Sequence, residues 1–491
     1  MIIDELISFW ARVKPHQPAV IQPDMIITYR ALDDAIEFIA RRIATLNLDP
    51  QKPVGVSIEH PAKQMAVCFA LQRAGFVAAP IYHALLPHLR SAGIADMIYE
   101  SEAGVLSGGR NIRFDSSWLP SGPLPPQPPG ATEPRRKTSP HLLFFTSGST
   151  GLPKAIVQTE AALIERMNIC ALTRDRDCSR ILILPGFSTN FGFNRLCEVL
   201  REGKTACFAF PGEGRLVLMS TYDVDCVVGS PQQIVALAEL REARPGYQLP
   251  ALNTVRIGGA FASREAVRRV QAALCRNVFV EYGSTEASLV AWAPHEMIAD
   301  IPDAVGFIGP WCELEIVDDA RTPLPPGQEG FIRYRTPFFL KNRAGASSQA
   351  QGDAERLWCY PGDIGYVAAN RVLCIRGRGD DILNCGGLKV SAGRLEEVLL
   401  KCSGVRDGAV CGIKGASGLE ELWIGVVPGP NFDLASFQRE LEQDEKFNEL
   451  LSAVGAEVVA INEVPRNQLG KIQRGELRDK LLAARKNPTL Q

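Results

Sequence analysis

Nine consecutive residues, Thr146 to Lys154, have side chains suited to holding phosphate groups. They read Thr-Ser-Gly-Ser-Thr-Gly-Leu-Pro-Lys and follow an apolar run, His141 to Phe145, that predicts a strand. Two glycines and four hydroxyls make a flexible loop that can surround phosphate oxygens, and Lys154 adds a positive charge. A Walker loop is excluded, because Ala155 follows the lysine where that motif requires Ser or Thr. An isolated loop of this composition is more often an ordinary surface turn.

Four further segments rich in glycine and polar residues follow this loop. They are Glu281–Glu286, Tyr360–Gly365, Arg376–Asp381 and Pro465–Ile472. The order and wide spacing of the five segments resemble the adenylate-forming superfamily. Its members are the acyl-CoA synthetases, the adenylation domains of nonribosomal peptide synthetases and the beetle luciferases. One such motif would be weak evidence, but five in order argue against coincidence, and the resemblance runs from about residue 5 to about residue 480.

The resemblance implies that the chain activates a carboxylic acid with ATP and Mg²⁺. In this interpretation Glu286 binds the magnesium ion, Thr285 reaches the α-phosphate, and Lys471 bridges the carboxylate and the α-phosphate. Taken alone, Glu286 could be a carboxylate at a helix start, and a Gly-Lys pair near the C-terminus carries almost no information. The residues expected at ATP or AMP are Thr146, Ser147, Gly148, Ser149, Thr150, Lys154, Gly258, Gly259, Ala260, Glu281, Tyr282, Gly283, Ser284, Asp363 and Arg378.

Individual roles within this set also follow from the resemblance. Tyr282 would stack on adenine, although a lone tyrosine is more often part of a core. The Gly258–Ala260 turn would let the backbone approach adenine and the acyl group. Asp363 would hold the ribose hydroxyls with help from Arg378, although an aspartate in a Pro-Gly-Asp turn can instead bond its own backbone.

A second half-reaction, attack of a thiol on the acyl-AMP, is implied as well. In the family a lid domain rotates about a hinge residue, which Asp380 matches here. The loop after this hinge contains Gly386 and Gly387, which would leave room for the phosphopantetheine arm of coenzyme A or could form a plain hairpin turn. Arg394 replaces the first glutamate of the family's Pro-x-Glu pattern, which puts the docking of the thiol acceptor in doubt.

The acyl pocket is expected around the segment Pro185 to Phe193. This segment contains no acidic residue, and an ammonium group buried without a carboxylate would be costly, which argues against an α-amino acid substrate. Its three phenylalanines favour an aryl or medium-length acyl group, although core packing explains them equally well. The expected pocket residues are Phe187, Thr189, Asn190, Phe191 and Gly258.

The hydrophobic pattern predicts an α/β fold with two domains. Residues 1–379 alternate helical and strand periods, as in layered βαβ units, and change after Gly306 to short strands of a small β-barrel-like subdomain. Residues 380–491 predict a small, mobile α+β lid domain. A chain of 491 residues exceeds what a single hydrophobic core supports, which agrees with this division.

Composition narrows the function classes further. The net charge of −2 and the absence of a basic tract give no reason to expect nucleic acid as a partner. The longest apolar stretch, Met65 to Tyr82, contains Gln72 and Arg73 and predicts a core helix running into a strand, with no membrane span. The N-terminal Asp4 and Glu5 and 13 cysteines without a framework pattern favour a cytoplasmic protein.

Three functions remain open at this point. The first is an acyl-CoA synthetase that uses ATP, CoA and a small carboxylic acid. The second is a stand-alone adenylation enzyme that loads the phosphopantetheine of an acyl or peptidyl carrier protein. The third is a non-catalytic nucleotide-binding regulator, and the joint presence of Lys154, Glu286, Asp363, Arg378 and Lys471 counts against it.

Overall fold

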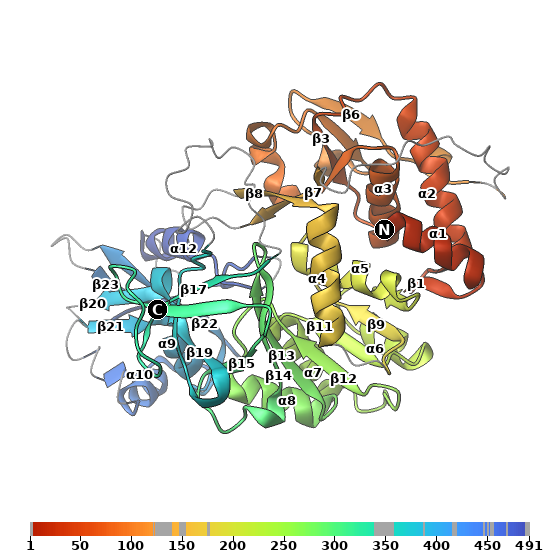
Figure 1. The fold of residues 1–491 in the computed structure, drawn as a ribbon. Coiled ribbons are helices and arrows are strands. Elements are labelled where there is room, and N and C mark those ends of the chain that lie inside the picture. Colours follow the sequence, from red (N-terminus) through yellow and green to blue (C-terminus); the bar gives the residue numbers. More distant parts are fainter. Residues whose placement is uncertain are drawn as a thin grey trace. The chain divides into compact units, whose positions relative to one another are not determined.

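The computed structural model describes residues 3–120, 122, 140–146, 154–173, 177–337, 358–385, 388–414, 420–444, 447–448, 451, 456–467 and 470–486. Contacts divide the chain into two compact units (Figure 1). The first unit comprises Met1–Ile298, Ile308–Glu313 and Arg335–Cys359. The second comprises Ala299–Phe307, Leu314–Tyr334 and Tyr360–Gln491.

The first unit contains a six-stranded sheet in the order β6-β5-β3-β4-β7-β8. Its strands from β6 to β7 pair in parallel, whereas β7 and β8 are antiparallel. The predicted strand at His141 to Phe145 is confirmed as part of β7, and the predicted phosphate loop is therefore the connection between two antiparallel strands. The strands are β3 (Pro53–Ser57), β4 (Val77–Pro80), β5 (Asp96–Tyr99), β6 (Arg110–Arg113), β7 (Pro140–Thr146) and β8 (Lys154–Thr159).

A larger sheet of the same unit has the strand order β14-β13-β12-β11-β9-β10-β1-β2. From β13 to β1 all neighbouring strands are parallel, whereas β14 pairs with β13 and β2 pairs with β1 in antiparallel orientation. The βαβ alternation predicted from the sequence is confirmed here. The strands are β1 (Pro18–Gln22), β2 (Met25–Thr28), β9 (Arg180–Ile183), β10 (Thr205–Cys207), β11 (Cys226–Gly229), β12 (Thr254–Ile257), β13 (Val278–Ser284) and β14 (Ser288–Pro294).

Helices cover both sheets of this unit. Helices α1, α2, α3 and α5 contribute apolar side chains to a core that also contains residues of both sheets, so this core lies between the sheets. Helices α6, α7 and α8 cover the opposite face of the larger sheet. The helices are α1 (Ile3–Val13), α2 (Tyr29–Ala44), α3 (Pro61–Arg73), α4 (Glu160–Leu172), α5 (Asn190–Arg201), α6 (Gly214–Thr221), α7 (Pro231–Ala243) and α8 (Arg264–Ala273).

Local sequence explains where several of these helices begin. Helix α2 has Thr28 as its N-cap and buries the stripe Leu32, Ile36, Ile39 and Ile43, as its 3.6-residue period predicts. Helix α7 begins with Pro231 behind a capping box formed by Ser230 and Gln233. Helix α6 was not expected from the sequence.

The second unit begins with short, mostly antiparallel strands in the order β16-β17-β18-β19-β15. A separate sheet follows in the order β21-β20-β23-β22 with β24 on β23; α9 and α10 cover one face, and α12 packs on the other. The elements are β15 (Ala304–Ile308), β16 (Glu313–Val317), β17 (Gly330–Arg335), β18 (Asp363–Val367), β19 (Val372–Arg378), β20 (Ile382–Cys385), β21 (Leu388–Ser391), α9 (Ala392–Leu399), β22 (Val405–Lys414), β23 (Glu420–Pro428), α10 (Leu434–Glu442), β24 (Ala456–Ala460) and α12 (Arg474–Lys486).

The division by contacts groups the chain differently from the predicted domains. The sequence placed the short strands after Gly306 with the N-terminal domain, whereas the contacts group most of them with the C-terminal residues. The domain boundary after Gly379 therefore stays a prediction. Among the described residues no helix is both long and apolar enough to cross a membrane.

Candidate active site

The segment Glu281–Glu286 forms the end of one strand and the tip of a hairpin. Strand β13 ends at Ser284 and β14 begins at Ser288, so Thr285, Glu286 and Ala287 make the turn. A side chain at Gly283 would place its Cβ 1.9 Å from the carbonyl oxygen of Ser288, so only glycine fits there. The turn itself is closed by the Ser284 hydroxyl, which accepts a hydrogen bond from the Ala287 N–H at 3.1 Å.

The carboxylate of Glu286 is available for a ligand. The residue is half-buried, and its carboxylate makes no hydrogen bond or ion pair with any residue that the structure describes. It lies on a hairpin tip, so the alternative of a helix-start carboxylate is wrong. The described residues contain no cluster of three metal-binding side chains. A single free carboxylate fits Mg²⁺ that arrives with substrate phosphates, because such ions take one or two carboxylates from the protein.

Glu281, expected at the nucleotide, has its carboxylate held by two arginines. Its Oε1 accepts a hydrogen bond from Arg256 Nε at 2.6 Å, and its Oε2 lies 3.2 Å from Arg195 Nη2. Arg195 also pairs with Glu198 at 2.9 Å. Burial alone would lower the pKa of Arg195, but the two carboxylates raise it above its ordinary value. The four side chains form a balanced, buried ion cluster, which we call the Arg195–Glu281 cluster.

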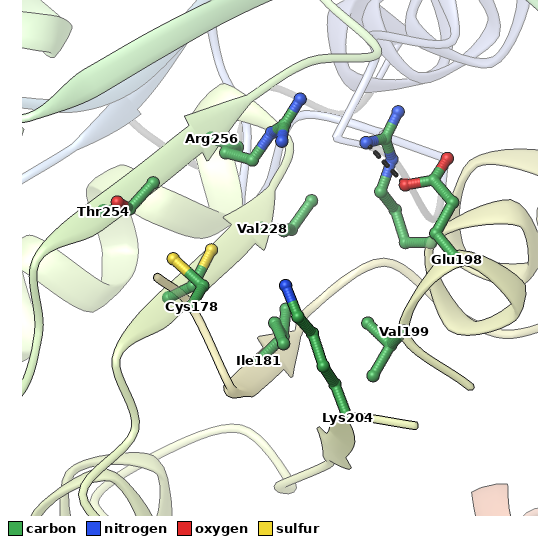
Figure 2. Close-up of a pocket in the computed structure, with 10 residues that line it drawn as sticks. Cys178, Ile181, Glu198, Val199, Lys204, Val228, Thr254 and Arg256 are labelled. Atoms are coloured by element: carbon green, nitrogen blue, oxygen red, sulfur yellow. Dashed lines mark ion pairs between the residues drawn. The ribbon is translucent and has the colours of Figure 1, made fainter. Parts of the chain in front are cut away.

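A pocket borders this cluster. Figure 2 shows Thr254 and Arg256 of β12 and Val228 of β11 around a space that Glu198 of α5 also borders. The dashed line in the figure marks the ion pair of Glu198 with Arg195. None of the five residues expected in the acyl pocket lines this space.

Two of the expected acyl-pocket residues do lie together. The ring of Phe191 covers the Gly258–Gly259 turn, and a Cβ built on either glycine would lie 3.3 or 3.5 Å from that ring. Gly259 has a φ of +83°, which favours glycine, so the turn needs its glycines for conformation as well as for space. The guanidinium of Arg195 lies 5.5 Å from the centroid of the Phe191 ring.

The other expected pocket residues have structural contacts of their own. Phe187 is 6% exposed and packs against Phe193, with ring centroids 5.1 Å apart, inside the core between the sheets. The Thr189 hydroxyl caps α5 by accepting the Gly192 N–H at 3.0 Å. Asn190 accepts a hydrogen bond from Asn194 at 3.3 Å. Of the alternatives that the sequence left open, core packing accounts for Phe187.

Asp363 and Arg378, expected at the ribose, face each other in the second unit. They are partners across the antiparallel strands β18 and β19, and Arg378 Nε lies 3.3 Å from Asp363 Oδ1. Arg378 Nη2 also donates to the carbonyl of Pro361 at 2.9 Å. The two residues therefore form one ion pair across neighbouring strands, and their place at the ribose stays a prediction.

Lys471 lies in a tight turn of the second unit. Its N–H donates to the side chain of Asn467 at 3.0 Å, and its carbonyl accepts the Asn467 N–H at 2.9 Å. Gly470 has a φ of +78° and Arg466 Nη1 donates to its carbonyl at 3.0 Å. Asn467 and Arg466 thus fix the backbone that carries the lysine.

Several expected site residues cannot be placed. Asp380 lies in the short 3₁₀ helix Gly379–Asp381, but its side chain is not described, and the same holds for the side chains of Thr146 and Lys154. Tyr282 is half-buried. Ser147, Gly148, Ser149, Thr150, Gly386 and Gly387 lie outside the described residues.

Sequence reasoning missed three arginines of this region, Arg166, Arg195 and Arg256. Each is buried in an element whose other buried residues are mainly apolar, and Arg256 stands in the fully buried strand Thr254–Ile257. Charged residues are almost never fully buried unless they are paired. An arginine inside an apolar stripe was therefore the signal that could have identified them.

The chain matches a known family and several known proteins. A sequence model of the family described as AMP-binding enzyme matches residues 7–342. A salicylyl-CoA synthase/salicylate adenylyltransferase of a Streptomyces species is 26% identical, over 96% of this chain and 92% of that protein. A phosphinothricin tripeptide synthetase of Streptomyces viridochromogenes is 28% identical over 82% of this chain, which spans only 38% of that protein.

The fold of the chain agrees with that of a solved structure. The o-succinylbenzoate CoA synthetase of Bacillus subtilis, in complex with its acyl-adenylate intermediate, superposes with a TM-score of 0.82. The match covers 96% of this chain and 98% of that one at 19% sequence identity. The same synthetase has also been solved with ATP and a magnesium ion.

Proposed function

The chain belongs to the family of AMP-binding enzymes, and we propose that it is an AMP-forming acid–thiol ligase for a small carboxylic acid. In the first half-reaction a carboxylate oxygen of the acid attacks the α-phosphorus of ATP, and the bond to pyrophosphate breaks. In the second, a thiol sulfur attacks the acyl carbonyl carbon, AMP leaves and a thioester forms. Coenzyme A is the acceptor that we propose.

One observation carries this proposal, namely the hairpin tip of Thr285 and Glu286. This half-buried carboxylate makes no hydrogen bond or ion pair with a described residue and has only an electrostatic interaction with Arg166, so it can still bind a cation. Magnesium bound there with the phosphates of ATP would neutralise the leaving pyrophosphate. A regulator that only binds nucleotide could use this carboxylate for magnesium but has no need for a lysine at the α-phosphate, so the tip together with Lys471 favours an enzyme.

The roles that we propose for the other site residues are taken from the family motifs that they match. Gly258 and Phe191 would border the acyl group, and Asp363 with Arg378 would hold the ribose. Lys471 would stabilise the charge that develops on the α-phosphate, because a preorganised cation is most effective where charge appears in the transition state. The turn made by Asn467 and Gly470 supports this role, since it fixes the backbone on both sides of the lysine.

The acid that we propose is an aryl or medium-length acyl carboxylate. Glu281, whose Cβ lies 3.4 Å from a Cβ built on Gly258, and Glu198, the ion-pair partner of Arg195, are already neutralised by Arg195 and Arg256. An α-ammonium group bound beside Phe191 would therefore lack a counter-charge from them. The similarity to a salicylate-activating protein supports the aryl class.

Loading of a carrier protein is the second candidate. It is favoured by the similarity to a peptide synthetase of which this chain spans 38%, because there the matching part is joined to further chain. Arg394 lies exposed on α9, shortly after the loop with Gly386 and Gly387, and stands where the family pattern has a glutamate. This difference concerns how the thiol acceptor docks, whether that acceptor is CoA or a carrier protein.

Pyrophosphate exchange tests the proposal. Purified protein is incubated with ATP, Mg²⁺ and radiolabelled pyrophosphate, with benzoates, cinnamates, C4–C10 fatty acids and the common amino acids in parallel. Exchange with an aryl or acyl acid, followed by thioester formation with free CoA, is the expected result. Exchange that is fastest with an amino acid, or no thioester without a carrier protein, would favour the second candidate. Absence of exchange with every acid would overturn both.

A further inference from the structure

Helix α4 buries two charged residues, Glu160 at its first position and Arg166 in the middle of its apolar face. Leu163, Met167 and Cys170 form the apolar part of this face, and Arg166 lies among them with an exposed fraction of 1%. The helix follows directly after β8, the strand at the end of the predicted phosphate loop, and packs against β14 (Figure 1). Arg166 has no role in the activity as proposed above.

The contacts of Arg166 are unusual for a buried arginine. Its Nη2 donates to the backbone carbonyl of Glu286 at 2.6 Å. Its Nε and Nη1 are buried and have no hydrogen-bond partner. Within the part of the chain that the structure describes no carboxylate lies at ion-pair distance from the guanidinium, although the charge of Glu286 acts to raise the pKa of Arg166. By contrast, Arg195 and Arg256 each contact a carboxylate.

Stability does not explain an arginine in this position. Burial lowers the pKa of Arg166 to about 10, so the side chain still carries its charge at neutral pH. A buried charge without a paired carboxylate loses its hydration and gains little in return, and an apolar residue of similar size is often as stable or more stable. The cost of burying this charge must therefore be offset by a function of the guanidinium, either its hydrogen bond to the backbone or its attraction of a negatively charged ligand.

What it holds is the tip of the β13–β14 hairpin. Two neutral hydrogen bonds fix Ala287, one from its own N–H to the Ser284 hydroxyl and one from the Thr336 hydroxyl to its carbonyl at 3.5 Å. Arg166 provides the bond to Glu286 itself, and it is the charged one of the three. A hydrogen bond from a charged donor is stronger than a neutral one, so Arg166 has the largest influence on where the Glu286 backbone lies.

We propose that Arg166 is a positioning residue for the magnesium-binding carboxylate: it fixes the backbone of Glu286, and the negative charge of bound ATP offsets its own charge. This inference rests on the proposed function, because the tip meets a triphosphate only if the chain uses ATP. It also explains why a guanidinium without an ion pair is kept here, because its positive charge would lie near the place where the phosphates would bind. Arg166 need not touch the nucleotide for either effect.

Two variants test the proposal, Arg166→Met and Arg166→Lys. Arg166→Met removes the charge and the hydrogen bond but keeps an apolar chain in the helix face. We expect it to melt at or above the temperature of the unliganded wild type, and to lose most of the thermal shift that ATP with Mg²⁺ produces. In pyrophosphate exchange its half-saturating magnesium concentration should rise about ten- to a hundredfold, the loss expected for one hydrogen bond from a charged group. Arg166→Lys should restore part of both effects, since an ammonium group can donate to the same carbonyl.

Arg73→Met is the matched control. Arg73 is a half-buried arginine of the first unit, with a side chain 14% exposed, and it pairs with Asp33 at 2.8 Å and with Asp4 at 3.4 Å. Its removal leaves these carboxylates without their ion-pair partner, so Arg73→Met should lower the melting temperature of the unliganded protein. It should leave the magnesium dependence of pyrophosphate exchange unchanged.

The outcomes separate this inference from the proposed function. If Arg166→Met destabilises the unliganded protein as much as Arg73→Met does, its role is structural and the inference fails. An unchanged thermal shift with ATP and Mg²⁺, or no recovery in Arg166→Lys, also overturns it. If the wild type shows no exchange with any acid, the proposed function fails, and the thermal shift alone still decides whether Arg166 supports binding of ATP with Mg²⁺.

Discussion

Replacing Glu281 by glutamine should mainly affect stability, because its carboxylate belongs to the Arg195–Glu281 cluster. The wild-type cluster contains two arginines and two glutamates, and their side chains are between 4% and 9% exposed. In Glu281→Gln one positive charge remains without a counter-charge inside the protein. Breaking a buried pair costs about 3–5 kcal/mol. Glutamine keeps an acceptor oxygen for Arg256, so we expect the lower end, about 3 kcal/mol of unfolding free energy.

The second substitution of a double-mutant cycle checks this magnitude. In Glu281→Gln with Arg256→Gln, the remaining Arg195 and Glu198 still pair at 2.9 Å, and the cluster is balanced again. The double variant should therefore be more stable than the sum of the single effects predicts, with a coupling energy of about 2 kcal/mol.

The assay is urea unfolding followed by tryptophan fluorescence. Trp292 lies directly opposite Glu281 in the β13–β14 ladder and stacks on Phe279 with ring centroids 5.3 Å apart, so its emission reports on this part of the sheet. A Trp292→Phe variant assigns that signal, which matters because a chain with two compact units need not unfold in one step. If Glu281→Gln leaves the stability unchanged but greatly raises the KM for ATP, the reasoning is refuted. Glu281 would then contact the nucleotide, as the resemblance implied.

Three further outcomes are expected. Lys471→Ala should form acyl-AMP about 10²–10³-fold more slowly, the loss expected when one preorganised donor is removed. It should still form the thioester from supplied acyl-AMP. An equal loss in the two half-reactions, measured separately, would contradict the role of Lys471. Glu286→Gln should slow pyrophosphate exchange at low magnesium and recover partly at high magnesium, because the unpaired carboxylate is the expected ligand; identical magnesium titrations would exclude it. Asp380→Pro should keep pyrophosphate exchange and lose thioester formation, because proline fixes the φ angle at the proposed hinge; wild-type rates in both assays would place the hinge elsewhere.

Local patterns in the sequence were sufficient for most of the fold of the first unit. The stripe Leu32 to Ile43 and the strand Thr254–Ile257 follow from periodicity, which depends only on neighbouring residues. Helix α6 was missed, because its short sequence Gly214–Thr221 has no strong period to distinguish it from a loop. The grouping of the short strands after Gly306 depends on contacts between distant segments, which local patterns do not contain.

For the candidate site, too, part could be predicted from the sequence and part depended on the tertiary structure. By itself the sequence determined which residue types the chemistry needs and their order along the chain, and it placed Asp363 and Arg378 in one role before the structure paired them. Only the tertiary structure decided that Glu281 is neutralised by Arg195 and Arg256, that Phe187 belongs to the core, and that Arg166 holds the Glu286 backbone. The physical reason is that a charge or a ring acquires its role from partners brought to it by folding. Arg166 and Glu286 are separated by 120 residues, and no spacing rule connects them.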